Sequence, residues 1–448
     1  MKRYFHLLLW IAASAVVPTL KAQTGADGSL STTNRDVTTH FFGVVDATAG
    51  PVTVLAIGDS VSESYRSIQL PLFQRLQGKL GIAGYSLQAP LNAAMIGIGN
   101  GTIMSGPTTN WWTPHEIVPP GGFVLWTNLN SPTASLVADT LGVFWIAQPA
   151  GGDFTLSVST NGGPWSEPVL TLNGASPTPK GCFASLHLPR LPYRLRVDGL
   201  SGTNLTLGPH YLDSTSTGVQ VAFLSQGGAN LNQVFSLSTN VLYPILAALN
   251  PQLVVWHMKE VADIGAVGLS NRLFDLEALW QAGVTNGDVV YIGTPYEIRD
   301  APAEFTPVQN RLVRQAATRD HRAYVDCMTP CISYSWMVTN GFLAGGDGIH
   351  PTDTCNQFLA DLTWSQLGFF ALRVDRRLAV EPLGSAVRLE WPTSAGLTYQ
   401  LESSSDCLHW ITVLSVRGDG LPFACTNSSP EFPASFYRLN LTETPPSG

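Results

Sequence analysis

The feature that most constrains this chain is an unbroken apolar run that ends in Gly58, Asp59 and Ser60. Residues 52–57 are Val-Thr-Val-Leu-Ala-Ile, and a continuous run of this kind bounded by a turn is typical of a parallel strand buried on both faces. Glycine allows the backbone to turn sharply at the end of the strand. Ser60 is therefore expected at the carboxyl edge of a sheet, where open α/β folds bind their ligands.

A serine at this edge needs a base to become a nucleophile, because its hydroxyl is only weakly nucleophilic while it keeps its proton. Asp347 and His350 lie three residues apart, next to a Gly-rich loop over residues 341–348 and before a helix predicted at 352–367. At this spacing the carboxylate can hydrogen-bond to the imidazole and fix its tautomer. The other ring nitrogen is then available to Ser60.

Gly58-Asp59-Ser60 near the start and Asp347-x-x-His350 near the end together resemble the SGNH (GDSL-like) hydrolase family. The resemblance covers about residues 50–100 and 218–372, and the two motifs in this order are more specific than either alone. One departure is that the family's Gly-Asp-Ser-Leu is Gly-Asp-Ser-Val here. The resemblance implies an α/β fold of SGNH (flavodoxin-like) type, with a parallel sheet sandwiched by helices, and a serine esterase.

The family also supplies amide donors to an oxyanion hole, and the resemblance extends to two further positions. Gly228 matches the glycine of the second block best, with Gly227 as its neighbour in doubt, since an amide without a Cβ can approach the oxyanion closely. An ordinary turn glycine is the alternative. The third block usually contains an asparagine, which this chain lacks between residues 250 and 271. Lys259 is the nearest potential donor there, unless it pairs with an acidic neighbour.

Composition limits the classes of function. The 448 residues allow two to four domains, and a hydrophobic content of 44% is ample for their cores. The net charge of −8 gives no basic surface, so nucleic acid is not an expected partner. The six cysteines lack the spacing of zinc ligands, and the chain has no nucleotide or redox motif. We therefore expect neither a metal nor a cofactor.

The N-terminal segment and the cysteines indicate the compartment. Residues 1–22 have a basic tip, an apolar run and a small residue before Gln23, which predicts a secretory signal peptide, with an uncleaved anchor as the alternative. No later run approaches the roughly 18–20 apolar residues of a membrane span. Six cysteines fit an oxidising compartment. We expect a secreted or periplasmic protein, with Cys407 and Cys425 as a plausible disulfide and cysteines 327, 331 and 355 offering another.

Changes of pattern divide the chain after the signal peptide. Short alternating runs between turn residues predict an inserted antiparallel β-sandwich and, near the end, a small C-terminal β module. Strands that alternate with helices elsewhere predict a parallel sheet. The predicted parts are a first hydrolase part at 23–103 (beginning with a loose lead-in over 23–50), the insert at 104–216, a second hydrolase part at 217–372 and the C-terminal module at 378–441.

The insert resembles the carbohydrate-binding-module-like insert of some bacterial SGNH peptidoglycan O-acetylesterases. Its tryptophans can stack on sugars, although a core position is favoured for any single one: Trp111, Trp112, Trp126, Trp145 and Trp165. The resemblance implies that Ser60, His350 and Asp347 remove O-acyl groups, most economically O-acetyl, from a polysaccharide or peptidoglycan. The alternatives are an acyltransferase on the same fold, and a glycan-binding or surface protein whose catalytic site has decayed. The sequence is silent on oligomeric state.

Overall fold

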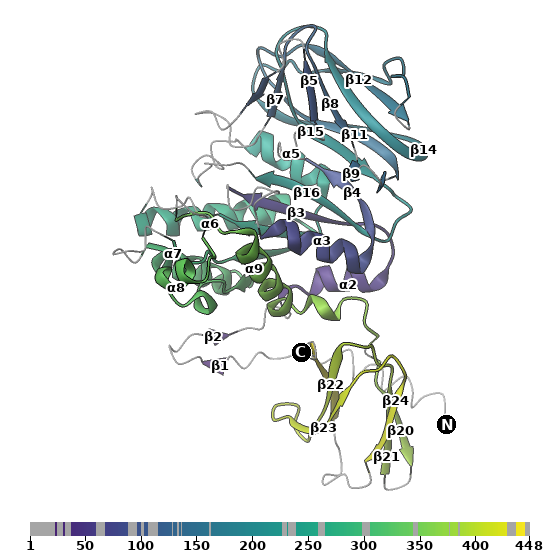
Figure 1. Cartoon of the computed structure of the whole chain (residues 1–448), viewed down its shortest axis with the longest axis vertical. Helices are drawn as coiled ribbons and strands as arrows, with labels where there is room; N and C mark the ends of the chain where they lie inside the picture. Colours follow the sequence, from purple (N-terminus) through teal and green to yellow (C-terminus); the bar gives the residue numbers. More distant parts are fainter. Residues whose placement is uncertain are drawn as a thin grey trace.

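The computed structural model describes most of the chain in three connected regions (Figure 1). A central sheet with its helices lies between a β-rich part at one end and a small β module at the other. The described residues are 23–24, 30–31, 37–59, 68–87, 96–99, 103–105, 115–127, 129–131, 134–135, 137–160, 163–225, 231, 239–258, 265–297, 305–343, 348–375, 377–383, 386–427 and 436–443.

Six of the described strands run parallel and form the central sheet, in the order β4-β16-β3-β17-β18-β19. Their bounds are β3 (Val52–Gly58), β4 (Ile82–Ser86), β16 (Val219–Ser225), β17 (Leu253–His257), β18 (Asp288–Ile292) and β19 (Ala323–Val325). Every residue of β3, β16, β17 and β18 is buried, as expected where helices cover both faces of a sheet. The apolar run at 52–57 is therefore the predicted buried strand, in the middle of the sheet.

Helices cover both faces of this sheet, so the predicted mixed α/β class is confirmed. On one face lie α2 (Thr39–Ala47), α3 (Gln69–Leu80), α8 (Tyr334–Thr339) and α9 (Asp353–Gln366), with the short 3-10 helices η5 (Thr329–Cys331) and η6 (Phe369–Ala371). On the other lie α5 (Thr239–Leu249), α6 (Gly265–Gly283) and α7 (Phe305–Arg319). Among the described helices, none is both long and apolar enough to cross a membrane.

The prediction of a loose lead-in over residues 23–50 is wrong at its C-terminal end. Residues 39–47 form α2, which buries Phe41, Phe42 and Val45. The ring of Phe41 lies 5.5 Å from that of Phe369, centroid to centroid, so α2 is part of the main core. The Thr-, Gly- and Asp-rich flanks hid its short apolar pattern. Earlier in the chain, β1 (Gln23–Thr24) and β2 (Leu30–Ser31) pair antiparallel.

The β-rich part (residues 96–212) joins the central sheet directly. Its last strand, β15 (Asn204–Leu212), pairs antiparallel with β4 and with β11 (Val137–Ala147). The long strand β14 (Lys180–Gly199) pairs with β11 and then, over 193–199, with β12 (Asp153–Thr160) and β8 (Phe123–Thr127). It thereby passes from one layer of strands to a second. The remaining strands are β5 (Ile96–Gly99), β6 (Ile103–Ser105), β7 (His115–Val118), β9 (Leu129–Ser131), β10 (Ala134–Ser135) and β13 (Leu170–Asn173).

The two layers of the β-rich part enclose a core of their own, and helix α5 covers the outer face of one layer. Trp126 and Trp145 belong to the enclosed core, so both are structural. Phe144, on the opposite face of β11, joins the cluster that contains α5. Trp165 is half-buried with the Arg194 guanidinium 5.0 Å from its ring centroid. Trp111 and Trp112 lie outside the described residues, and the predicted domain boundaries stay predictions.

The C-terminal module consists of two three-stranded sheets around a small core. One contains β20 (Ala379–Leu383), β21 (Ala386–Trp391) and β24 (Phe423–Asn427), and the other β22 (Leu397–Ser404), β23 (Ile411–Arg417) and β25 (Phe436–Glu443). The predicted disulfide between Cys407 and Cys425 is wrong, since both are free thiols. Cys425 lies on β24 in the first sheet, whereas Cys407 lies in the turn between β22 and β23 in the second. Cysteines 327, 331 and 355 form no disulfide either.

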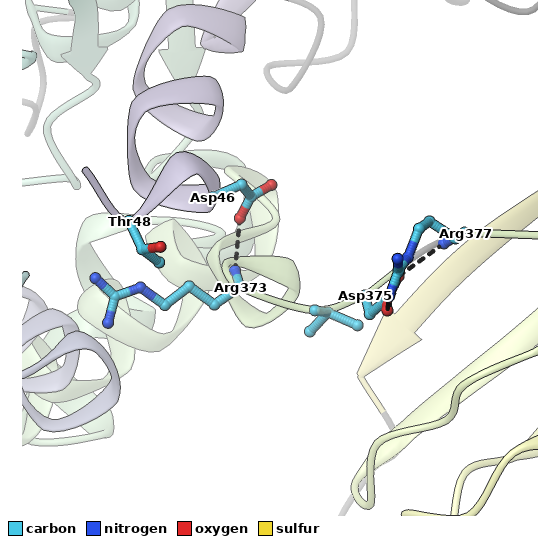
Figure 2. Close-up of a pocket in the computed structure, with 6 residues that line it drawn as sticks. Asp46, Thr48, Arg373, Asp375 and Arg377 are labelled. Atoms are coloured by element: carbon cyan, nitrogen blue, oxygen red, sulfur yellow. Dashed lines mark hydrogen bonds and ion pairs between the residues drawn. The ribbon is translucent and has the colours of Figure 1, made fainter. Parts of the chain in front are cut away.

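Arg373 fixes the linker between the central sheet and this module (Figure 2). Its backbone N–H donates to the Asp46 carboxylate at 2.7 Å. Its guanidinium donates to the carbonyls of Leu80 at 2.9 Å and of Val45 at 3.5 Å, near the C-termini of α3 and α2, and to Thr217. Helix C-termini carry partial negative charge, so a guanidinium is well suited to this position.

Replacing Arg373 with methionine is expected to lower the free energy of unfolding by about 2 kcal/mol, because hydrogen bonds from a charged donor contribute about 1.5–3 kcal/mol. Urea unfolding of the purified protein measures this change. Arg377→Met is the matched control, since the Arg377 side chain is 89% exposed and its ion pair is with neighbouring Asp375. Equal losses in the two variants would contradict the role of Arg373.

Candidate active site

Three central strands end side by side at the edge where the sequence predicts the nucleophile. Gly58, the last residue of β3, is in register with Ser225 at the end of β16 and with His257 at the end of β17. The chain leaves all three strands at this carboxyl edge. Along the sequence, Ser60, Gly228 and Lys259 follow these strand ends by two or three residues.

Of the predicted site residues, the structure describes His350. Ser60, Asp347, Gly228, its alternative Gly227 and Lys259 all lie outside the described residues. Their roles therefore stay predictions, whereas the strand ends that precede Ser60, Gly228 and Lys259 are fixed by the register of the sheet.

The half-buried His350 belongs to a short segment that is anchored at its end. Thr352 N–H donates to the Phe342 carbonyl at 2.9 Å, and Thr352 Oγ1 donates to the Gly341 carbonyl at 2.9 Å. Thr352 also caps α9, since its hydroxyl accepts a hydrogen bond from Cys355 N–H at 3.3 Å. The predicted helix start is thus confirmed, and His350 lies two residues before its cap.

Two contacts show that α9 runs in the same direction as α3. Arg75 in the middle of α3 forms an ion pair with Asp361 in the middle of α9 at 2.8 Å. Further along, Lys79 Nζ donates to the carbonyl of Phe370, which follows α9, at 3.0 Å. At 1.5 Å per residue, the starts of the two helices are level to within about one turn. Because α3 follows β3 in the chain, the start of α9, with His350 three residues before it, lies near the carboxyl edge.

Buried polar side chains gather at this same edge. Asp59, His257 and Glu297 are at most 1% exposed. The atoms Ser225 Oγ, Thr294 Oγ1 and Gln309 Oε1 are buried and have no hydrogen-bond partner among the residues that the structure describes. Each such atom costs about 1–3 kcal/mol, and a functional role is one reason why a protein retains it. Together these six side chains mark the edge as the candidate active site.

The sequence reasoning did not single out Ser225, Thr294, Glu297 or Gln309. A usable signal existed for the first two, because each comes at the end of, or directly after, a buried apolar strand, as Ser60 does. Gln309 gave no such signal, since it lies within helix α7. Within the described part of the chain, no group of three or more His, Cys, Asp or Glu side chains is arranged to hold a metal ion.

Comparison with known proteins bears on the fold. A solved structure of a peptidoglycan O-acetylesterase is similar to this chain, with a TM-score of 0.57 and 16% identity over 74% of this chain and 95% of that one. The chain resembles the SGNH hydrolases in fold. No family model and no curated protein matches the sequence.

Other solved structures match at a TM-score of 0.27. One is a catalytic mutant of an acetylxylan esterase from Geobacillus stearothermophilus, 17% identical over 34% of this chain and 74% of that one. Another is a family two carbohydrate esterase from Clostridium thermocellum in complex with cellohexaose, 10% identical over 60% of this chain and 99% of that one. Matches at a TM-score of 0.27 say nothing further about this chain, and the similarity to the acetylesterase, at 16% identity, concerns the fold alone.

Proposed function

We propose that this protein is a serine esterase that removes O-acyl groups, most economically O-acetyl, from a polysaccharide or from peptidoglycan. The observation that carries the proposal is the shared register of Ser225, Gly58 and His257, since the segments that contain Ser60, Gly228 and Lys259 each follow one of these strand ends in the sequence. The direction of α9 places the segment containing His350 at that edge too. We further propose export to the cell exterior or periplasm after removal of residues 1–22.

In the proposed reaction, Ser60 Oγ attacks the acyl carbonyl carbon while His350 accepts the hydroxyl proton and Asp347 orients the imidazole. The amides of Ser60 and Gly228, with Lys259, stabilise the oxyanion of the tetrahedral intermediate. The carbon–oxygen bond to the sugar then breaks, and His350 returns its proton to the leaving oxygen. Water attacks the acyl-serine with the help of His350, which releases the carboxylic acid and restores Ser60. Every step uses side chains and backbone of this chain.

The polymeric substrate is proposed from the architecture. The similar solved structure is a peptidoglycan O-acetylesterase, and the match covers 74% of this chain and 95% of that one. In this chain β15 connects that part directly to β4, so its strands are joined to the sheet that holds the candidate active site. A surface that extends beyond the acyl group is what a polymer requires.

The test is hydrolysis of 4-nitrophenyl acetate, butyrate and octanoate, followed by acetate release from acetylated xylan and O-acetylated peptidoglycan. We expect the acetate ester to be the best of the three, and acetate release from at least one polymer. Activity no higher than that of Ser60→Ala on all of these substrates would overturn the proposal and favour the glycan-binding alternative. Transfer of the acetyl group to an added alcohol in preference to water would favour the acyltransferase.

A further inference from the structure

Helix α7 presents two adjacent amide side chains to the carboxyl edge of the sheet. Gln309 Nε2 donates to the Met258 carbonyl at 3.0 Å, directly after β17. Asn310 binds Thr294 after β18 twice: its Nδ2 donates to the Thr294 carbonyl at 2.8 Å, and its Oδ1 accepts from the Thr294 N–H at 3.0 Å. Both amides are only 3% exposed. Each therefore fixes the backbone where a central strand ends.

The two amides differ in one respect. Asn310 uses both of its polar atoms on Thr294, as a purely structural clamp would. Gln309 uses only its nitrogen, while its buried Oε1 has no partner among the described residues. An apolar side chain of the same size would avoid the desolvation cost that this unpaired oxygen imposes, while it would leave the Met258 carbonyl without its donor. The glutamine is therefore better explained by what it does for the site than by stability.

The place where Gln309 acts is the second distinguishing feature. Met258 follows His257, which is level with Gly58 at the end of the neighbouring strand. Asn310 acts one strand further out, after β18. The exit of β17 leads directly to Lys259, the nearest candidate for the third oxyanion donor. A displacement of about 1 Å in such a group can cost about 10²-fold in rate.

We propose that Gln309 is a positioning residue for ester hydrolysis: its amide fixes the peptide at the exit of β17 and so directs the following residues toward the reacting acyl group. This inference rests on the proposed esterase function. Gln309 itself touches neither substrate nor nucleophile in this proposal. Its effect is exerted through the Met258 carbonyl.

The test compares Gln309→Met with Asn310→Leu, two near-isosteric replacements in the same helix. Gln309→Met is expected to lower kcat by about 10–100-fold with KM changed less than about threefold, since positioning acts on the transition state. Asn310→Leu breaks two hydrogen bonds instead of one, so we expect the larger fall in melting temperature but the smaller loss of kcat. Losses of kcat that simply follow the melting temperature in both variants would overturn the proposal.

Two further measurements keep the outcome decisive. In a Lys259→Ala background, Gln309→Met should cost less than about threefold in kcat, because coupled residues are not additive; full additivity would contradict action through this loop. If Gln309→Met does not fold, Gln309→Ala removes the donor without adding any other polar group, and a loss of kcat at least as large is expected. If the wild-type protein has Ser60-dependent activity and Gln309→Met keeps it, the inference about Gln309 is overturned and the proposed function is not. Absence of Ser60-dependent activity in the wild-type protein overturns the proposed function as well.

Discussion

Replacing Ser60 with alanine is expected to lower kcat for 4-nitrophenyl acetate by about 10⁴–10⁶-fold, and His350→Ala by about as much. The serine hydroxyl forms the acyl bond, and the imidazole moves the proton in both halves of the reaction. Because the two groups act as one unit, the double variant should be no slower than either single variant. Substrate binding does not use this unit, so KM should change little.

The neighbouring strand ends supply matched controls for this prediction. Ser225 has a buried hydroxyl in register with Gly58, and His257 is a buried imidazole on the other side of it. Ser225→Ala is expected to lower kcat less than about tenfold, since its hydroxyl is not the nucleophile. A loss of kcat as large as that of Ser60→Ala would mean that the nucleophile is Ser225 on β16 and not Ser60. The matching outcome for the base is a His257→Gln protein that is correctly folded but inactive while His350→Ala is still active. That result would mean that the base is His257 on β17 and not His350.

The sequence predicted those parts of the site that depend on local patterns. A strand buried on both faces has to be a continuous apolar run, so residues 52–57 and the position of Ser60 after them could be identified without a structure. The start of α9 was equally clear, because Thr352 provides the cap that a helix after His350 needs. From the order of the two motifs along the chain we then predicted that they act together, and this stays a prediction.

The features that the sequence did not show depend on pairing between distant segments. Short alternating runs predict strands in the β-rich part, such as those over 154–159 and 193–197, but not that β15 joins their layers to β4. Proximity in the sequence favoured Cys407 with Cys425, whereas Cys425 lies on β24 and Cys407 lies in the turn that joins β22 and β23 of the other sheet. Gln309 acts on Met258, 51 residues away, and no local pattern distinguishes it from any other helical glutamine.

The strand that joins the two regions contains a buried histidine whose protonation is expected to weaken the fold. His210, on β15, is 6% exposed, and its Nδ1 lies 3.1 Å from Ser86 Oγ on β4 and 3.4 Å from Gln220 Nε2 on β16. An amide nitrogen can only donate, so Nδ1 acts as an acceptor and the ring is neutral. Burial lowers the pKa of His210 from 6.5 to about 4. The rings of Phe144 and Phe183 complete its surroundings.

The direction of the pH effect follows from this pKa. Between pH 6.5 and 4 the unfolded chain binds a proton at His210 that the folded protein does not bind, so stability falls as the pH falls. The lowered pKa corresponds to a loss of about 3 kcal/mol in the free energy of unfolding. This loss develops between about pH 7 and pH 4 and is nearly complete at pH 4. Urea unfolding at pH 7, 5.5 and 4 measures the free energy of unfolding at each value.

The variant His210→Gln isolates this contribution. Carboxylates that titrate in the same range affect wild type and variant alike, so their difference in free energy of unfolding should shift by about 3 kcal/mol in favour of the variant between pH 7 and pH 4. His187→Gln is the control for loss of a histidine, because His187 is an exposed side chain on β14. Parallel pH profiles for wild type and His210→Gln would show that His210 does not make the junction of β4 and β15 acid-sensitive. A shift confined to His210→Gln would mean that acid weakens the fold through the strand that connects the β-rich part to the candidate active site.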